Sequence, residues 1–307
     1  MERFDILGLG CTSVDDLIYV ASYPAADSKV PILRRERQGG GLTGTALVAA
    51  ARMGARCQYA GGLGSDEFSR FVQRRLEEEG IGLDHLDRRD DPRPVHSVII
   101  VDESRQTRTI FFDSEGAAEA RVDWPPEDVI RAAGVLFVDH FGIEGMIRAA
   151  RTARAAGIPV VADFECLPAD QRLAELVALA DHPVTSLDFA QQWTGCQRPA
   201  DAARALWNAT RQAVVVTCGA DGCWYVGGGD PHTPRHQPAM RVTAVDTTGC
   251  GDVFHGAYAA GLAQGLELPD RVRLASAAAA IKATRRGGQA GIPTRDAVDR
   301  FLKEYRE

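Results

Sequence analysis

The segment VDTTGCGDVF, residues 245–254, carries the strongest structural signal in the chain. The sequence predicts a buried strand that ends at Asp246, a turn with two glycines, and a helix that begins at Asp252. In such a unit the backbone N–H groups of the turn point to one spot, where the helix dipole adds positive potential. Gly249 and Gly251 allow an anion to approach the backbone closely. The segment therefore predicts an anion site beside the carboxylate of Asp252.

Outward from this segment, buried strands and helices alternate. Continuous apolar runs predict strands at residues 6–10, 135–139, 160–163, 213–217 and 242–246. Amphipathic or alanine-rich runs predict helices at residues 43–53, 65–79, 144–156, 252–264, 269–285 and 295–305. Strands of this kind, separated by helices, indicate a mostly parallel sheet covered on both faces. We expect an α/β fold with one domain over residues 1–307.

Two β-rich stretches interrupt this alternation. Apolar and polar residues alternate within residues 16–37 and 95–113, which predicts half-exposed strands. We interpret both stretches as insertions that form a small β-sheet lid. An exposed strand at the edge of that lid could pair with a second copy of the chain, so we expect a homodimer through the lid.

Composition excludes several classes of protein. The chain has 307 residues, of which 45% are hydrophobic and 25% charged, as in ordinary globular proteins. Its net charge of −7 gives no electrostatic reason to bind nucleic acid or an anionic membrane. The seven cysteines contain no C-x-x-C pair and are interpreted as reduced thiols. With no targeting segment or membrane span evident in the sequence, we expect a cytoplasmic protein.

The 245–254 segment resembles the D-T-x-G-A-G-D-x-F signature of the ribokinase-like, or PfkB, carbohydrate kinase family, with Cys250 in place of alanine. The resemblance implies a three-layer α/β/α fold. It also implies transfer of the γ-phosphoryl group of ATP, with Mg²⁺, to a hydroxyl of a monosaccharide or sugar derivative. By this match Asp252 is the general base, and the backbone of Gly249, Cys250 and Gly251 forms the anion hole.

Three further stretches carry the expected sugar site. The glycine cluster before the helix at 43–53 resembles the family's G-G-x-x-x-N signature, in which Gly40 and Gly41 line the sugar pocket. Thr45 stands where the family has asparagine and retains a hydroxyl. Asp15 fits the family's G-x-x-x-x-D pattern, which places a carboxylate on the sugar hydroxyls. His140 is expected to contact substrate because it ends a predicted strand that faces the cleft.

The expected nucleotide site comes from later motifs. The stretch from Thr217 resembles the family's T-x-G-x-x-G turn on the nucleotide phosphates. The residues that the resemblance assigns to nucleotide binding are Thr217, Gly219, Gly222, Thr247, Gly249, Gly251, Ala283 and Gly288. By position, Asp246 and Thr248 could hold a monovalent cation, K⁺, with Ala283 and Gly288. The family's N-x-x-E motif, which orders Mg²⁺ and phosphate, is replaced by residues 186–189, SLDF.

The acceptor is left open by the sequence. Within the family the likeness is greatest to sulfofructose-kinase and ketohexokinase types. Of the residues aligned with the sulfonate ligands of the former, Lys29 matches the lysine, but His140 and Phe112 replace arginine and asparagine and are unsuited to that role. The alternatives are a nucleoside kinase on the same fold and a catalytically silent sugar-sensing homologue. His255, one turn into the helix that begins at Asp252, is interpreted as a structural hydrogen-bonding residue.

Overall fold

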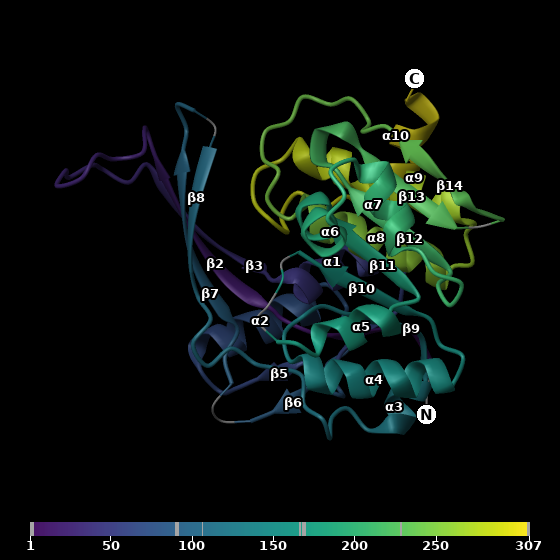
Figure 1. The fold of residues 1–307 in the computed structure, drawn as a ribbon. Coiled ribbons are helices and arrows are strands. Elements are labelled where there is room, and N and C mark those ends of the chain that lie inside the picture. Colours follow the sequence, from purple (N-terminus) through teal and green to yellow (C-terminus); the bar gives the residue numbers. More distant parts are fainter. Residues whose placement is uncertain are drawn as a thin grey trace.

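Eight strands form the central sheet of the computed structural model, which describes residues 3–89, 92–105, 107–165, 167, 170–227 and 229–305. Their order is β14-β13-β12-β11-β10-β9-β1-β4 (Figure 1). From β12 to β4 all neighbours are parallel, whereas β13 and β14 run antiparallel to theirs. The strands are β1 (Phe4–Leu9), β4 (Cys57–Tyr59), β9 (Ala133–Val138), β10 (Val160–Phe164), β11 (His182–Ser186), β12 (Ala213–Thr217), β13 (Cys223–Gly227) and β14 (Asp230–Gln237).

Helices cover both faces of this sheet, because side chains alternate along its strands. Ile6 of β1 packs in one hydrophobic core, and the next residue, Leu7, packs in another on the opposite face. The first core includes residues of α1 (Leu42–Arg52), α2 (Glu67–Glu78), α8 (Cys250–Ala263), α9 (Leu268–Ala283) and α10 (Arg295–Glu304). The second includes residues of α3 (Glu127–Arg131), α4 (Ile143–Ala155), α5 (Leu173–Leu179) and α6 (Leu187–Thr194). A smaller core contains α7 (Pro199–Leu206).

A separate four-stranded sheet lies beside this body (Figure 1). Its order is β3-β2-β7-β8, with bounds β3 (Arg34–Gly40), β2 (Ser13–Val20), β7 (Val95–Asp102) and β8 (Thr107–Asp113). A third sheet pairs β5 (Gly62–Leu63) with β6 (Asp87–Arg88). The predicted fold class, an α/β body with a mostly parallel sheet and a smaller β-sheet, is confirmed. Closure of the small sheet over a ligand stays a prediction.

The strand predicted at residues 242–246 is wrong. The structure has no strand there, and the chain runs to α8 without joining the sheet. The N–H groups of Val245 and Asp246 donate instead to the carbonyl oxygen of Ala283 at the end of α9, at 2.7 and 3.0 Å. Because these N–H groups are used by a helix end, they cannot enter a strand ladder. The segment lies against α9 and leads directly into the turn before α8.

Two helices that follow glycine turns pack tightly against each other. A Cβ atom at Gly256 of α8 would lie 2.0 Å from the carbonyl oxygen of Ala46 in α1, so only glycine allows this approach. Ala46 is the fifth residue of α1 and Gly256 the seventh of α8. At 1.5 Å per residue, the contact lies about 6 Å from the start of α1 and about 9 Å from the start of α8. The contact therefore brings the two glycine turns close together.

Two further observations concern the thiol state of the cysteines and the length of the helices in the described part of the chain. Six cysteines are free thiols, and the seventh, Cys166, lies outside the described residues. None of the described helices combines the length and apolar character needed to cross a membrane.

Candidate active site

The turn before α8 presents backbone donors to an open space. Gly249 caps the helix in the left-handed region at φ 72°, a conformation that favours glycine. Within the described residues, the N–H groups of Gly251 and Asp252 have no hydrogen-bond acceptor in the protein. A Cβ atom at Gly251 would find no nearer atom than Oε1 of Glu165, 3.9 Å away. The first turn of α8 thus has the free donors and the access that an anion requires.

Asp252 lies on this first turn in a strongly acidic setting. Its side chain is half-buried. Burial, reinforced by the negative charges of Glu165, Asp163, Asp15 and Asp139, raises the pKa of the Asp252 carboxyl well above its usual range. These four groups come from three segments, β2, the end of β9 and the end of β10, so the fold gathers carboxyl groups around the helix start. A raised pKa suits a carboxylate that must take up a proton during a reaction.

A buried ion pair lies next to Asp252. Nδ1 of His255 is 2.6 Å from Oδ2 of Asp163, at the end of β10, and both side chains are shielded from solvent. Burial alone would lower the pKa of His255, but the attraction of Asp163 outweighs it and the net pKa is raised. One ligand atom from each of Asp163, Asp252 and His255 lies within 4.8 Å of the others. His255 therefore fixes the carboxylate of Asp163 close to Asp252.

Glu165 follows β10 and was missed by the sequence analysis, as was Asp163. Burial and the charge of Asp163 raise the pKa of Glu165 to about 7. Both residues lie at the carboxyl end of a central parallel strand, which is where open α/β sheets place their ligands. Their position at the end of the predicted strand at 160–163 was the signal that could have identified them.

Asp15 and Gly40 are neighbours on the small sheet, as the sugar-site prediction requires. Oγ of Ser13 donates to Oδ1 of Asp15 at 2.9 Å. A Cβ atom at Gly40 would lie 2.3 Å from that Oγ atom and 2.4 Å from Oδ2 of Asp15, so glycine leaves room for the carboxylate. Burial raises the pKa of Asp15. Gly41 caps α1 at φ 85°, where a Cβ atom would meet the backbone of Thr12 at 2.5 Å.

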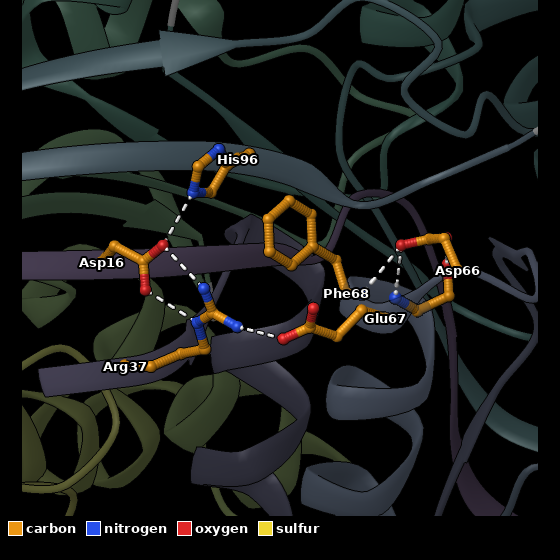
Figure 2. Close-up of polar contacts among 7 residues, drawn as sticks. Asp16, Arg37, Asp66, Glu67, Phe68 and His96 are labelled. Atoms are coloured by element: carbon orange, nitrogen blue, oxygen red, sulfur yellow. Dashed lines mark hydrogen bonds and ion pairs between the residues drawn. The ribbon is translucent and has the colours of Figure 1, made fainter.

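Asp16 of β2 lies in an ion-pair network that links the small sheet to α2 (Figure 2). Its carboxylate accepts bonds from Nε and Nη2 of Arg37 at 2.7 and 3.0 Å, and lies 2.9 Å from Nε2 of His96. Arg37 also donates to Glu67 on α2 at 2.7 Å, and the ring of His96 stacks on Phe68 with centroids 4.5 Å apart. This network fastens three strands of the small sheet to the body. In the same view Asp66 caps α2.

Two predicted substrate residues have protein contacts of their own. Thr45 is buried in α1, and its hydroxyl accepts a bond from Nε2 of Gln289 at 3.3 Å. His140 is half-buried after β9 and its ring lies 5.0 Å from that of Phe141. The neighbouring Asp139 is fully buried and accepts bonds from the N–H of Cys11 at 2.7 Å and from Thr43 at 2.9 Å. His140 is thus anchored at the start of the small sheet.

Six of the predicted nucleotide residues lie on two turns, and the other two, Ala283 and Gly288, lie at and just after the end of α9. Gly288 is close to the second turn, because a Cβ atom at Gly249 would lie 3.2 Å from its carbonyl oxygen. Thr217 ends β12 and donates to the carbonyl of Thr185 at 3.2 Å. Gly219 begins a short 3-10 turn, and Gly222 ends it at φ 87°, where a Cβ atom would lie 2.1 Å from a backbone oxygen of Gln237. Gly222 is therefore required by the turn itself. On the other turn, the hydroxyl of Thr247 accepts a bond from Arg108 of β8 at 3.2 Å.

Two of the four residues expected to hold K⁺, Asp246 and Ala283, have oxygens that already accept hydrogen bonds. Oδ1 and Oδ2 of Asp246 accept the N–H groups of Thr248 and Gly287, both at 2.8 Å. The carbonyl oxygen of Asp246 accepts a bond from the ammonium of Lys282 at 2.9 Å, and that of Ala283 accepts two N–H groups. An ammonium beside these oxygens repels a second cation. The donor set therefore does not fit K⁺ as an added ion.

These features are compatible with a site that binds an anionic group, and comparison with known proteins assigns the family. The chain belongs to the pfkB family of carbohydrate kinases, because the family's model matches residues 10–295. The resemblance found in the sequence is thereby confirmed. The protein is a kinase, a phosphotransferase with an alcohol group as acceptor.

Individual relatives span nearly the whole chain. A ribokinase from Haemophilus influenzae is 26% identical over 302 residues, which cover 96% of this chain and 97% of the relative. The crystal structure of a candidate ribokinase from Agrobacterium tumefaciens is 31% identical, has a TM-score of 0.90 and covers 98% of each chain. Arabidopsis thaliana ribokinase, solved with ribose and ATP, shares the fold at 21% identity, with a TM-score of 0.81 and 99% of each chain covered.

Proposed function

We propose that the protein is an ATP-dependent sugar kinase that transfers the γ-phosphoryl group to a hydroxyl of a monosaccharide or sugar derivative. The observation that carries this proposal is the start of α8, where the N–H groups of Gly251 and Asp252 have no acceptor among the described residues and lie beside the half-buried carboxylate of Asp252. The N–H of Cys250, expected in the anion hole, donates instead to the carbonyl oxygen of Thr247 at 3.2 Å. The turn would receive the transferred phosphoryl group, and Asp252 would face the acceptor hydroxyl.

Asp15 and Gly40 support a sugar as the acceptor. The charge of Asp15 helps to raise the pKa of Asp252, so the two carboxylates lie near enough for their charges to interact. A carboxylate that accepts two neighbouring hydroxyls forms strong charge-assisted hydrogen bonds. The same excess of carboxylates repels an anionic acceptor and favours a neutral polyol. His140, Gly40 and Gly41 would line the remaining sides of the sugar.

In the proposed reaction the acceptor hydroxyl oxygen attacks the γ-phosphorus in line and its bond to phosphorus forms. The bond between the γ-phosphorus and the bridging oxygen breaks, and ADP leaves with that electron pair. Asp252 takes the hydroxyl proton. The N–H groups of Gly251 and Asp252 stabilise the negative charge on the phosphoryl oxygens.

The carboxylates present fit Mg²⁺. Glu165 offers oxygen ligands of the type that Mg²⁺ prefers. The pKa values of Glu165 and Asp252 are raised by burial and by neighbouring negative charges, which a divalent cation would offset. Glu165 would hold Mg²⁺ together with the ATP phosphates. When bound, Mg²⁺ supplies positive charge that neutralises the phosphate oxygens.

Contacts between the small sheet and the body support its role as a lid. Arg108 of β8 bonds Thr247 in the anion turn at 3.2 Å, and Glu103, between β7 and β8, pairs with Arg286 after α9 at 2.9 Å. Closure of this sheet over the sugar would exclude water, which otherwise competes as the acceptor.

A panel of acceptors tests the proposal. The purified protein is given ATP and Mg²⁺ with ketoses, aldoses, sugar phosphates and nucleosides in turn, and ADP formation is measured with D252N as the matched control. We expect at least one neutral sugar to give ADP and a phosphorylated product with the native chain only. Preferential turnover of a nucleoside would replace the sugar assignment. Nucleotide or sugar binding without ADP formation would favour a sensor.

A further inference from the structure

A buried ammonium lies beneath the anion turn. The chain has three lysines, and Lys282, near the end of α9, is the one whose side chain is fully buried. Its Nζ atom donates to the carbonyl oxygen of Asp246 at 2.9 Å. Asp246 is three residues before Gly249, the residue that caps α8. The positive charge of Lys282 therefore sits under the segment that leads into the anion turn.

This ammonium lacks a full set of partners. A lysine ammonium has three donors, but within the described residues the carbonyl of Asp246 is the one hydrogen-bond acceptor of Lys282, and no carboxylate forms an ion pair with it. A buried charge is costly unless negative charge compensates it. Burial lowers the pKa of Lys282, and the charges of Asp246 and Asp252 offset only part of this effect. The phosphate groups expected at the turn would add further compensation. The arrangement thus prepares positive potential for an anionic ligand.

One of the oxygens expected to hold K⁺, the carbonyl oxygen of Asp246, accepts the ammonium of Lys282. Both carboxylate oxygens of Asp246 accept N–H groups, and the carbonyl oxygen of Ala283 accepts the N–H groups of Val245 and Asp246. An ammonium carries the same charge as K⁺ and binds the same type of carbonyl oxygen. Because it is tethered to α9, it is present without the entropy loss of capturing an ion from solution.

We propose that the ammonium of Lys282 replaces a bound monovalent cation, so that nucleotide binding and turnover do not depend on K⁺. Lys282 acts as a positioning residue: it holds the carbonyl of Asp246, and with it the approach to the turn at 249–251, and adds positive potential below the phosphates. This inference rests on the proposed function, because it requires the turn at 249–251 to bind the phosphates of a nucleotide.

The test measures ADP binding by titration calorimetry and turnover with the best acceptor, each in K⁺, Na⁺ or tetramethylammonium chloride. For the native chain we expect ADP affinity and turnover to agree within about twofold among the three salts. K282M keeps the length of the side chain and loses its charge, so ADP affinity should fall by about tenfold or more. K303M, at an exposed lysine of α10, is the matched control and should behave as the native chain.

K282A allows a test that separates a charge role from a merely structural one, namely whether small cations restore ADP affinity. It removes the tether and leaves space, so K⁺ or ammonium ions should restore part of the lost ADP affinity, and tetramethylammonium should not. Activation of the native chain by K⁺ of about tenfold or more would overturn the proposal. So would a folded K282M with native ADP affinity and turnover.

Circular dichroism would reveal a variant that fails to fold. In that case the dependence of the native chain on K⁺ still decides whether Lys282 replaces a bound cation. Failure of the proposed function would be distinguishable, because no acceptor would then yield ADP, whatever the salt dependence of ADP binding.

Discussion

Replacement of Gly251 by valine separates the fold from phosphate binding. A Cβ atom at this position would have its nearest neighbour 3.9 Å away, at Oε1 of Glu165, and the backbone is not in the left-handed region. Glycine is less favourable than alanine in a helix by about 1 kcal/mol, and valine by no more than about 0.7 kcal/mol. We therefore expect G251V to fold with native or slightly higher stability.

The same side chain would occupy the space that the phosphate must enter. Each hydrogen bond to a charged group contributes about 1.5–3 kcal/mol. Loss of one such bond from the N–H of Gly251 would weaken nucleotide binding by about 10- to 150-fold, at 1.4 kcal/mol for each factor of ten. The loss should be greater if the bulk of valine also displaces the phosphate from the N–H of Asp252.

Two measurements on one sample decide this prediction. Thermal unfolding followed by circular dichroism gives the stability, and titration calorimetry with ADP gives the affinity. G251A is the graded control and should fall between the native chain and G251V in affinity. A G251V protein that is folded and binds and uses ATP as the native chain does would remove the turn from the phosphate site.

Three further variants probe Asp252, its setting and the helix contact behind it. D252N should lose about 10²–10⁴ in kcat while ATP binding persists, because a general base is removed; unchanged kcat would exclude that role. Since the pKa of Asp252 is raised, activity should be lost as pH falls through a value above that of an ordinary aspartate, and E165Q, which removes a negative neighbour, should move this acid limb of kcat/KM to lower pH. An unmoved or oppositely moved limb would show that the two groups are not coupled. G256A places a Cβ atom 2.0 Å from the carbonyl of Ala46, so denaturant titration should show a loss of about 1–3 kcal/mol, and native stability would contradict the packing described.

Periodicity predicted most of the fold because parallel strands buried on both faces are continuous apolar runs. Periodicity failed at residues 242–246, some of which are also apolar and β-branched. There the N–H groups of Val245 and Asp246 bond the carbonyl of Ala283, about 40 residues later in the chain. Such a contact between distant segments leaves no local pattern.

Some residues of the candidate site could likewise be predicted from the sequence, and others could not. Gly249, Gly251 and Asp252 are adjacent in sequence and their geometry is local, so a motif predicted them. Asp163 acts through an ion pair with His255, about 90 residues away, and carries no motif of its own. Lys282 was part of a helix predicted from its alanine-rich composition. Its role depends on where the end of α9 meets the segment at 246, which only the tertiary structure specifies.

The most direct measurement is a crystal structure with a non-hydrolysable ATP analogue, Mg²⁺ and the acceptor identified by the panel. We predict the terminal phosphate within hydrogen-bond distance of the N–H groups of Gly251 and Asp252, with the acceptor hydroxyl between that phosphate and the carboxylate of Asp252. A nucleotide bound with its phosphates away from this turn, or a sugar remote from Asp252, would contradict the assignment of the catalytic centre.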